Sequence, residues 1–208
     1  MRQLRSFVPV LLALAMAACG DIPQAITAAG EPSRVVLAPV CVYFDPPLFA
    51  DSVGGPHGQV PGDPWFTENA IPVSLHAFHH SAPTPASFGE AFVRPAFVAP
   101  AFGAGKIART NNINLGFDFS GVGFTPASVT FDWRDYGGHE NLKVNGSPIH
   151  IGELIAAPSP HGGATVTHAW FSGGGGAFKQ GTTTLTGPVT YLRVGGQEFF
   201  LDNVCANP

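Results

Sequence analysis

Alternation of apolar and polar residues is the dominant pattern in the second half of the chain. Every second residue is large and apolar through residues 113–119, and again through residues 129–133. A period of two is typical of a β-strand with one buried face. The same alternation places the Trp133 side chain on the inward face of its strand, so we expect it in the core and not at a ligand site.

The remaining strand signals are short and separated by turn signals. β-type runs occur at residues 41–44, 71–77, 142–144, 149–151, 165–171, 189–194 and 198–205. Asn145-Gly146 between two of these runs predicts a β-hairpin. Prolines interrupt residues 81–105, so any strand there is expected at a sheet edge. No long segment carries a helical apolar stripe, and the pattern predicts an all-β fold, an antiparallel two-sheet β-sandwich of the jelly-roll kind.

Composition supports this prediction. The chain of 208 residues has 26 Gly and 20 Pro, and its charged residues make up 12%, against about 25% in an average soluble domain. Hydrophobic residues reach 45% and aromatic residues 11%. A chain this apolar can bury enough surface to fold, which excludes a disordered protein. The many helix breakers argue against a helical bundle.

The N-terminal segment has the features of an export signal. Arg2 and Arg5 precede an apolar run over residues 7–18, which is too short to span a bilayer and is typical of a secretory signal peptide. Residues 15–19, Ala-Met-Ala-Ala-Cys, resemble the lipobox of bacterial lipoproteins. This resemblance implies lipidation of Cys19, and Gly20 after it implies transfer to the outer membrane. An ordinary signal peptide, with Cys19 incidental, is the alternative.

The sequence therefore divides into three segments. Residues 1–19 are predicted to be the signal peptide with its lipobox, residues 20–39 a flexible tether rich in Ala, Pro and Gly, and residues 40–208 the β-sandwich domain. Without Arg2 and Arg5 the 10 basic side chains fall to 8 against 14 acidic ones, a net charge of −6. This charge argues against nucleic acid or an anionic lipid surface as a partner. A membrane partner is expected only through the lipid anchor.

The chain has three cysteines, Cys19, Cys41 and Cys205. An odd number in an exported protein leaves one to explain, and lipidation accounts for Cys19. Exported compartments are oxidising, so we expect a Cys41–Cys205 disulfide that ties the first strand to the last. It would close a loop of about 165 residues, for which loop-closure entropy predicts a large stabilisation. Two free buried cysteines are the alternative.

The segment GGQEFFLDNVC at residues 195–205 resembles the last strand of carbohydrate-binding-module jelly rolls. Together with CVYFD at 41–45 and NLKVNG at 141–146, it is also similar to a group of poorly characterised secreted bacterial β-sandwich proteins. The likeness covers residues 40–205. It implies a galactose-binding-like jelly roll that binds a glycan or another cell-surface ligand without catalysis.

The same resemblance implies a structural calcium ion where the first and last strands meet. Its candidate ligands are Asp45 and Asp202, because Ca²⁺ prefers carboxylate and carbonyl oxygens. Asp45 stands where a longer Glu is common in those modules. The alternative is that Asp45 caps a turn before Pro46 and Asp202 faces solvent.

Ligand contacts are expected in the stretch that follows Trp133. Sugar rings stack on aromatic side chains, while their hydroxyl groups need amides and carboxylates, and this stretch supplies both types in Asp135, Tyr136, His139 and Asn141. Trp65 and Trp170 lie in other segments that could expose an aromatic ring. These residues favour a lipid-anchored, non-catalytic binding protein at the outer membrane.

Two further classes of function stay open. One is a structural or adhesive surface protein without a small-ligand site. The other is a metal-dependent enzyme that uses His76, His79 and His80 in the segment SLHAFHH, although on one flat strand only residues 76 and 80 share a face. A carboxylate pair for glycoside hydrolysis could come from Asp132, Asp135, Glu140 or Glu153, and spacing alone cannot select the pair.

Overall fold

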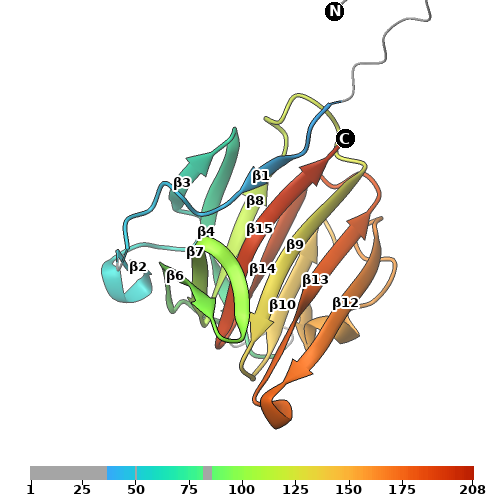
Figure 1. Cartoon of the computed structure of the whole chain (residues 1–208). Helices are drawn as coiled ribbons and strands as arrows, with labels where there is room; N and C mark the ends of the chain where they lie inside the picture. The colour runs from blue at the N-terminus through green and yellow to red at the C-terminus, as the bar shows by residue number, and fades with distance from the viewer. Residues whose placement is uncertain (1–36, 50, 82–85) are drawn as a thin grey trace, which may run out of the picture. The chain divides into compact units, whose positions relative to one another are not determined.

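Two antiparallel β-sheets stacked face to face form the part of the chain that the computed structural model describes, residues 37–49, 51–81 and 86–208 (Figure 1). The predicted all-β, two-sheet sandwich is therefore confirmed. The predicted signal peptide, the lipobox Cys19 and most of the tether lie outside the described residues. Within those residues no helix is long and apolar enough to cross a membrane.

The described strands fall into a first sheet of eight and a second sheet of seven. The first sheet runs in the order β12 (Thr165–Gly173), β13 (Phe178–Thr186), β9 (Ser128–Asp135), β15 (Phe199–Asn207), β7 (Ala101–Asn111), β6 (Glu90–Val98) and β2 (Val53–Gly54), with β1 (Val40–Val42) also paired to β15. The second sheet runs in the order β11 (His150–Gly152), β10 (Glu140–Val144), β14 (Tyr191–Gly196), β8 (Ile113–Asp118), β4 (Ile71–His79) and β3 (Pro64–Glu68), with β5 (Ala86–Ser87) paired to β4. Three short 3₁₀ turns complete the list: η1 (Gly55–His57), η2 (Leu154–Ala156) and η3 (Gly174–Gly176).

The core lies between the two sheets and is built from the alternating residues of the strands. Val129, Phe131 and Trp133 of β9 all point into it. The Trp133 ring is 1% exposed and stacks on Phe199, with ring centroids 6.3 Å apart. The expectation that Trp133 is a core residue is confirmed. By the same alternation Thr130, Asp132 and Arg134 lie on the opposite, outer face of the first sheet.

A disulfide joins Cys41 to Cys205, as the sequence predicts. The two cysteines stand directly opposite each other in the antiparallel pairing of β1 with β15, with their Cα atoms 4.0 Å apart. The first and last strands of the sandwich are thus covalently joined. β1 contributes only three residues to this pairing.

The hairpin of β6 and β7 curls over the outer face of the first sheet, in front of β15 in Figure 1. The Ala104 N–H donates to Asp202 Oδ2 of β15 at 2.9 Å, which fixes the hairpin on the sheet. The prolines of this region were expected to confine its strands to an edge. β7 instead lies inside the sheet between β15 and β6, because Pro95 occupies a bulge in β6 and Pro100 lies between the two strands.

Candidate functional site

Arg134 holds the β6–β7 hairpin against the sheet. The hairpin in turn separates two hollows on the outer face of the first sheet. The Arg134 guanidinium has no exposed surface and donates to the carbonyl oxygens of Pro100 and Ala101 at 2.9 and 3.2 Å. It also lies over the rings of Phe97, Phe102 and Phe178, at 4.5 to 5.2 Å from their centroids. Aromatic faces and carbonyl oxygens together stabilise this buried cation.

The first hollow, which we name the edge groove, has a volume of about 510 Å³. Its floor comes from β9, β12 and β13 and one wall from hairpin residues 101–103. Asp132 lies opposite Thr182, which lies opposite Ala169, so the three share the outer face. The Thr182 hydroxyl donates to Asp132 Oδ1, and Asn203 Nδ2 donates to Asp132 Oδ2 at 2.8 Å.

Phe171 of the edge strand β12 lines the edge groove with its side chain on the outer face, whereas the side chain of the neighbouring Trp170 stands beside Gly181 on the opposite face, the face of Trp133. Trp170 is 44% exposed and Phe171 51%. The Phe171 ring packs against the edge of Phe178, with centroids 6.2 Å apart. Gly173 makes room for the Phe178 ring, because a Cβ atom at residue 173 would come within 2.0 Å of that ring. Exposed aromatic side chains that are held in place beside a hollow are typical of an interaction site.

The second hollow, the arginine pocket, has a volume of about 240 Å³ and lies on the other side of the hairpin. Arg94, Arg109 and Glu198 supply its charges. Tyr136, one of the predicted ligand residues, lines this pocket and is 38% exposed. Its ring contacts Phe200, with centroids 5.6 Å apart.

The other predicted ligand residues do not gather around Tyr136. Asn141 is fully buried, which corrects the expectation of a surface contact, and its amide bonds the His79 backbone. Asp135 is also buried, and its Oδ1 accepts the Gly137 N–H at 2.7 Å. His139 is exposed and lines a third hollow of about 610 Å³, together with His80, His150 and His161.

The predicted calcium ligands, Asp45 and Asp202, occupy different environments. Asp45 is exposed, and its backbone carbonyl accepts from Lys106 Nζ. Asp202 is 1% exposed, and its two oxygens accept the N–H groups of Ala104 and Asn203. Burial raises the pKa of Asp202 to about 6, and the charges of Asp132 and Asp45 contribute. Calcium at this pair stays a prediction.

The histidines of SLHAFHH do not converge on a common point. His76 Nε2 lies 2.9 Å from both the Ser74 and the Tyr191 hydroxyl oxygens, and burial lowers the pKa of His76 to about 4. His80 Nε2 bonds the Ser87 hydroxyl at 2.9 Å. Among the described residues, one group of three potential metal ligands comes together, and it contains no histidine.

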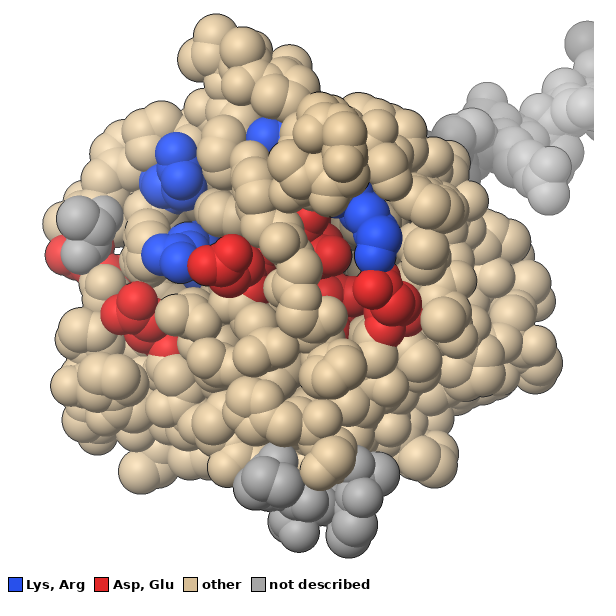
Figure 2. Space-filling view, turned by 90° about the horizontal axis from the view of Figure 1, so that it is seen from below, with Lys and Arg blue, Asp and Glu red and all other residues tan. Residues whose placement is uncertain are grey.

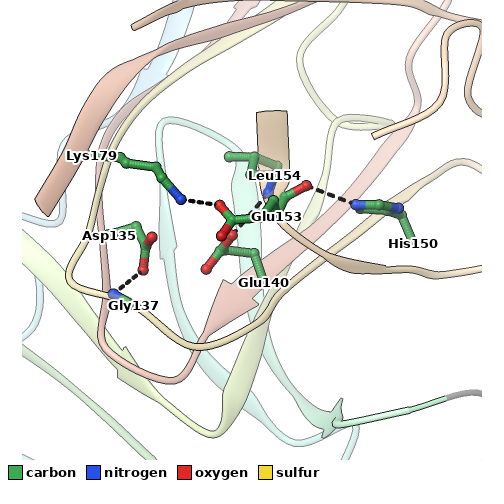
Figure 3. A network of polar contacts seen from close by, with 7 residues as sticks. All are labelled: Asp135, Gly137, Glu140, His150, Glu153, Leu154 and Lys179. Carbon is green, nitrogen blue, oxygen red and sulfur yellow. Dashed lines mark hydrogen bonds and ion pairs between the residues drawn. The ribbon is translucent and has the colours of Figure 1, made fainter. Parts of the chain in front are cut away.

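That group, the acid cluster, consists of Asp135, Glu140 and Glu153 (Figure 3). One carboxylate oxygen from each residue lies within 4.8 Å of the other two. Glu140 is 1% exposed, and its Oε2 accepts the Leu154 N–H at 2.8 Å. Glu153 is exposed and forms an ion pair with Lys179.

The acid cluster has unusual electrostatics. Burial raises the pKa of Glu140 to about 8, and the neighbouring Asp135 carboxylate adds to this. Burial also raises the pKa of Asp135. The sequence offered four acidic residues as candidates for a carboxylate pair. The structure brings three of them together in the acid cluster, while the fourth, Asp132, lies apart in the edge groove. The sequence signal was only the presence of acids around the Gly137-Gly138 turn.

No protein-family model, curated protein or solved structure matches this chain. The likeness of its motifs to carbohydrate-binding-module jelly rolls accordingly stays an expectation from the sequence.

Proposed function

We propose that this protein is an exported, lipid-anchored, non-catalytic binding protein of the outer membrane, and that it binds glycan in the edge groove. The observation that carries the proposal is the exposed ring of Phe171 beside the polar floor of the groove. Aromatic rings offer large apolar surfaces on which the apolar face of a sugar can stack. A binding site of this kind combines such surfaces with a few fixed polar groups.

The polar groups of the edge groove are fixed by contacts within the protein. Gln180 Oε1 accepts from the Arg134 guanidinium, and Gln180 Nε2 donates to the Ala101 carbonyl at 3.0 Å. A glutamine amide has two N–H donors, so the second one remains for a ligand. The Asp132 carboxylate likewise has lone pairs beyond its two bonds. Sugar hydroxyl groups need such a mixture of donors and acceptors.

Binding to a glycan array, followed by calorimetric titration of the sugars that bind, tests the proposal. Phe171→Ala should weaken binding at least roughly tenfold, the effect of losing about 1.4 kcal/mol. Thr167→Ala is a matched control, because Thr167 is exposed on the same face of β12 but does not line the groove. If Tyr136→Ala abolishes binding and Phe171→Ala does not, the arginine pocket is the site and the edge groove is not.

An adhesive protein is the second candidate, and one observation favours it. β12 is the last strand on its side of the first sheet, so its outer backbone groups can pair with a strand of another protein. Exposed Trp170 and Phe171 would then bury against that partner. A chain that binds no glycan on the array, but whose binding to cell-surface protein is lost in Phe171→Ala, would support this function instead.

A further inference from the structure

The acid cluster lies where one sheet passes into the other. Asp135 is the last residue of β9 in the first sheet, and Glu140 is the first residue of β10 in the second. Glu153 immediately precedes η2. Figure 2 shows this end of the sandwich, with acidic side chains gathered near the centre and basic side chains to either side. A ligand of the acid cluster would therefore connect both layers of the fold.

The buried carboxyl groups have fewer donors than they need. Asp135 Oδ1 has the Gly137 N–H and Glu140 Oε2 has the Leu154 N–H. Glu140 Oε1 is buried and has no N–H or hydroxyl donor among the described residues; it faces the carboxyl group of Asp135 (Figure 3). Lys179, the nearby cation, bonds the exposed Glu153. An acceptor that is buried without a donor is costly, so a positive species is needed between Asp135 and Glu140.

We propose that a calcium ion binds between Asp135, Glu140 and Glu153. The site offers only carboxylate oxygens, which suit a hard cation better than zinc, whose protein sites are built mainly from Cys sulfur and His nitrogen. Oxygens that surround one calcium at about 2.3–2.6 Å lie at most roughly 5 Å apart. The three oxygens of the acid cluster lie within 4.8 Å of one another.

Burial, and after it the neighbouring Asp135 carboxylate, raise the pKa of Glu140 to about 8, so a proton occupies Glu140 at neutral pH when calcium is absent. Calcium and the proton therefore compete, and calcium should bind more tightly as the pH rises toward 8. The charged groups around the proposed calcium position are the three carboxylates of the acid cluster and Lys179. The His150 ring is also near and bonds the backbone carbonyl of Glu153.

The bound ion would also fix the loop of residues 136–139. Both ends of that loop, Asp135 and Glu140, would be ligands of one ion. Tyr136 in the loop lines the arginine pocket, so calcium should hold one wall of that pocket. This inference does not depend on glycan binding in the edge groove.

The test is a calcium titration of the purified protein after treatment with EDTA, followed by thermal unfolding and by calorimetry. Calcium should raise the melting temperature in a saturable way, because it binds the folded state, and calorimetry should give one ion per chain. Magnesium should bind at least tenfold more weakly, since it keeps its waters and needs a tight octahedron. No heat of binding and no change in melting temperature at millimolar calcium would overturn the proposal.

Variants locate the ion. Glu140→Gln keeps the size of the side chain and should abolish the calcium response. Glu153→Gln changes only the exposed member, so it should stay folded and bind calcium at least tenfold more weakly. Lys179→Gln should bind it more tightly, because the competing ammonium group is gone. A response that survives Glu140→Gln and Glu153→Gln but is lost in Asp202→Asn would place the ion at the first and last strands and overturn this site.

Discussion

The side-chain amide of Asn141 pairs with the backbone of His79 in both directions. Asn141 Oδ1 accepts the His79 N–H at 2.7 Å, and Asn141 Nδ2 donates to the His79 carbonyl at 2.9 Å. Asn114 Nδ2 donates to the same Oδ1 at 3.0 Å. A side chain thus completes the hydrogen bonding at the end of β4, where the backbone would otherwise lack a partner.

Asn141→Ala should therefore destabilise the protein. The change leaves the His79 N–H and carbonyl without partners in a half-buried environment, at about 1–3 kcal/mol for each buried polar group left unpaired. Urea unfolding should show a loss of roughly 2–4 kcal/mol on this basis. His139→Ala, in the exposed loop nearby, should stay within about 0.5 kcal/mol of the parent. Equal stabilities of the two variants would refute the structural role of Asn141.

Reduction of the Cys41–Cys205 disulfide should cost about 2–5 kcal/mol, the usual loss for a native bridge in a small exported domain. The bridge closes a long loop, since the two cysteines are 164 positions apart, and a long loop gains much conformational entropy when it opens. Mass spectrometry of unreduced peptides should find the linked pair. Two thiols that alkylate in the folded protein would contradict the bridge.

The contribution of Glu140 to the free energy of unfolding of the calcium-free protein should fall as the pH rises. Glu140 has a pKa of about 8 in the folded protein and 4.5 in the unfolded chain, so between these values the folded state binds more protons. Stability from this group is present at low pH and is lost as the pH rises through 8. Unfolding in EDTA at pH 5 to 8 measures how the free energy of unfolding changes with pH, and the parent should lose more stability over this range than Glu140→Gln. An equal loss in both proteins would exclude Glu140 as its source.

Cys19→Ala should release the protein from membranes into the soluble fraction, because the lipid is attached through that cysteine in the proposed anchor. Membrane fractionation with antibody detection measures this. The Ala variant of Cys41 is a control that removes a cysteine but leaves the anchor. Continued co-sedimentation of Cys19→Ala with the outer membrane would show that the anchor is wrong.

The sequence predicts those strands whose two faces differ in polarity. Residues 113–119 and 129–133 are such cases, and the structure has β8 and β9 there. β13 was missed because threonines occupy both of its faces, so the strand shows no alternation of apolar and polar residues. Thr183 is buried on the inner face, where a large apolar residue would have marked the strand. β7 was missed because its first half, Ala101–Gly105, consists mainly of small residues.

The candidate sites were harder to predict because they depend on contacts between distant segments. Residues 135–141 were expected to form one ligand surface. Asn141 lies on the face of β10 opposite the core residues Leu142 and Val144, but it is buried there because the end of β4 at His79 packs on it. Asp135 is buried next to Glu140 and Glu153. The acid cluster needs the sharp turn at Gly137 and Gly138, whose φ values are 121° and 98°. Such a turn returns Glu140 to Asp135, and residue spacing alone does not specify it.

The Cys41–Cys205 bond also determines how the domain responds to a pull on its N-terminal end. β1 is held to the sheet by only three paired residues. Without the disulfide, a small force would detach β1 from β15 by breaking its hydrogen bonds one after another. The covalent bond at Cys41 stops this unzipping at the second residue of the strand and passes the load to β15. β15 lies between β9 and β7, so the strain spreads across neighbouring strands in shear, the direction in which a sheet resists most.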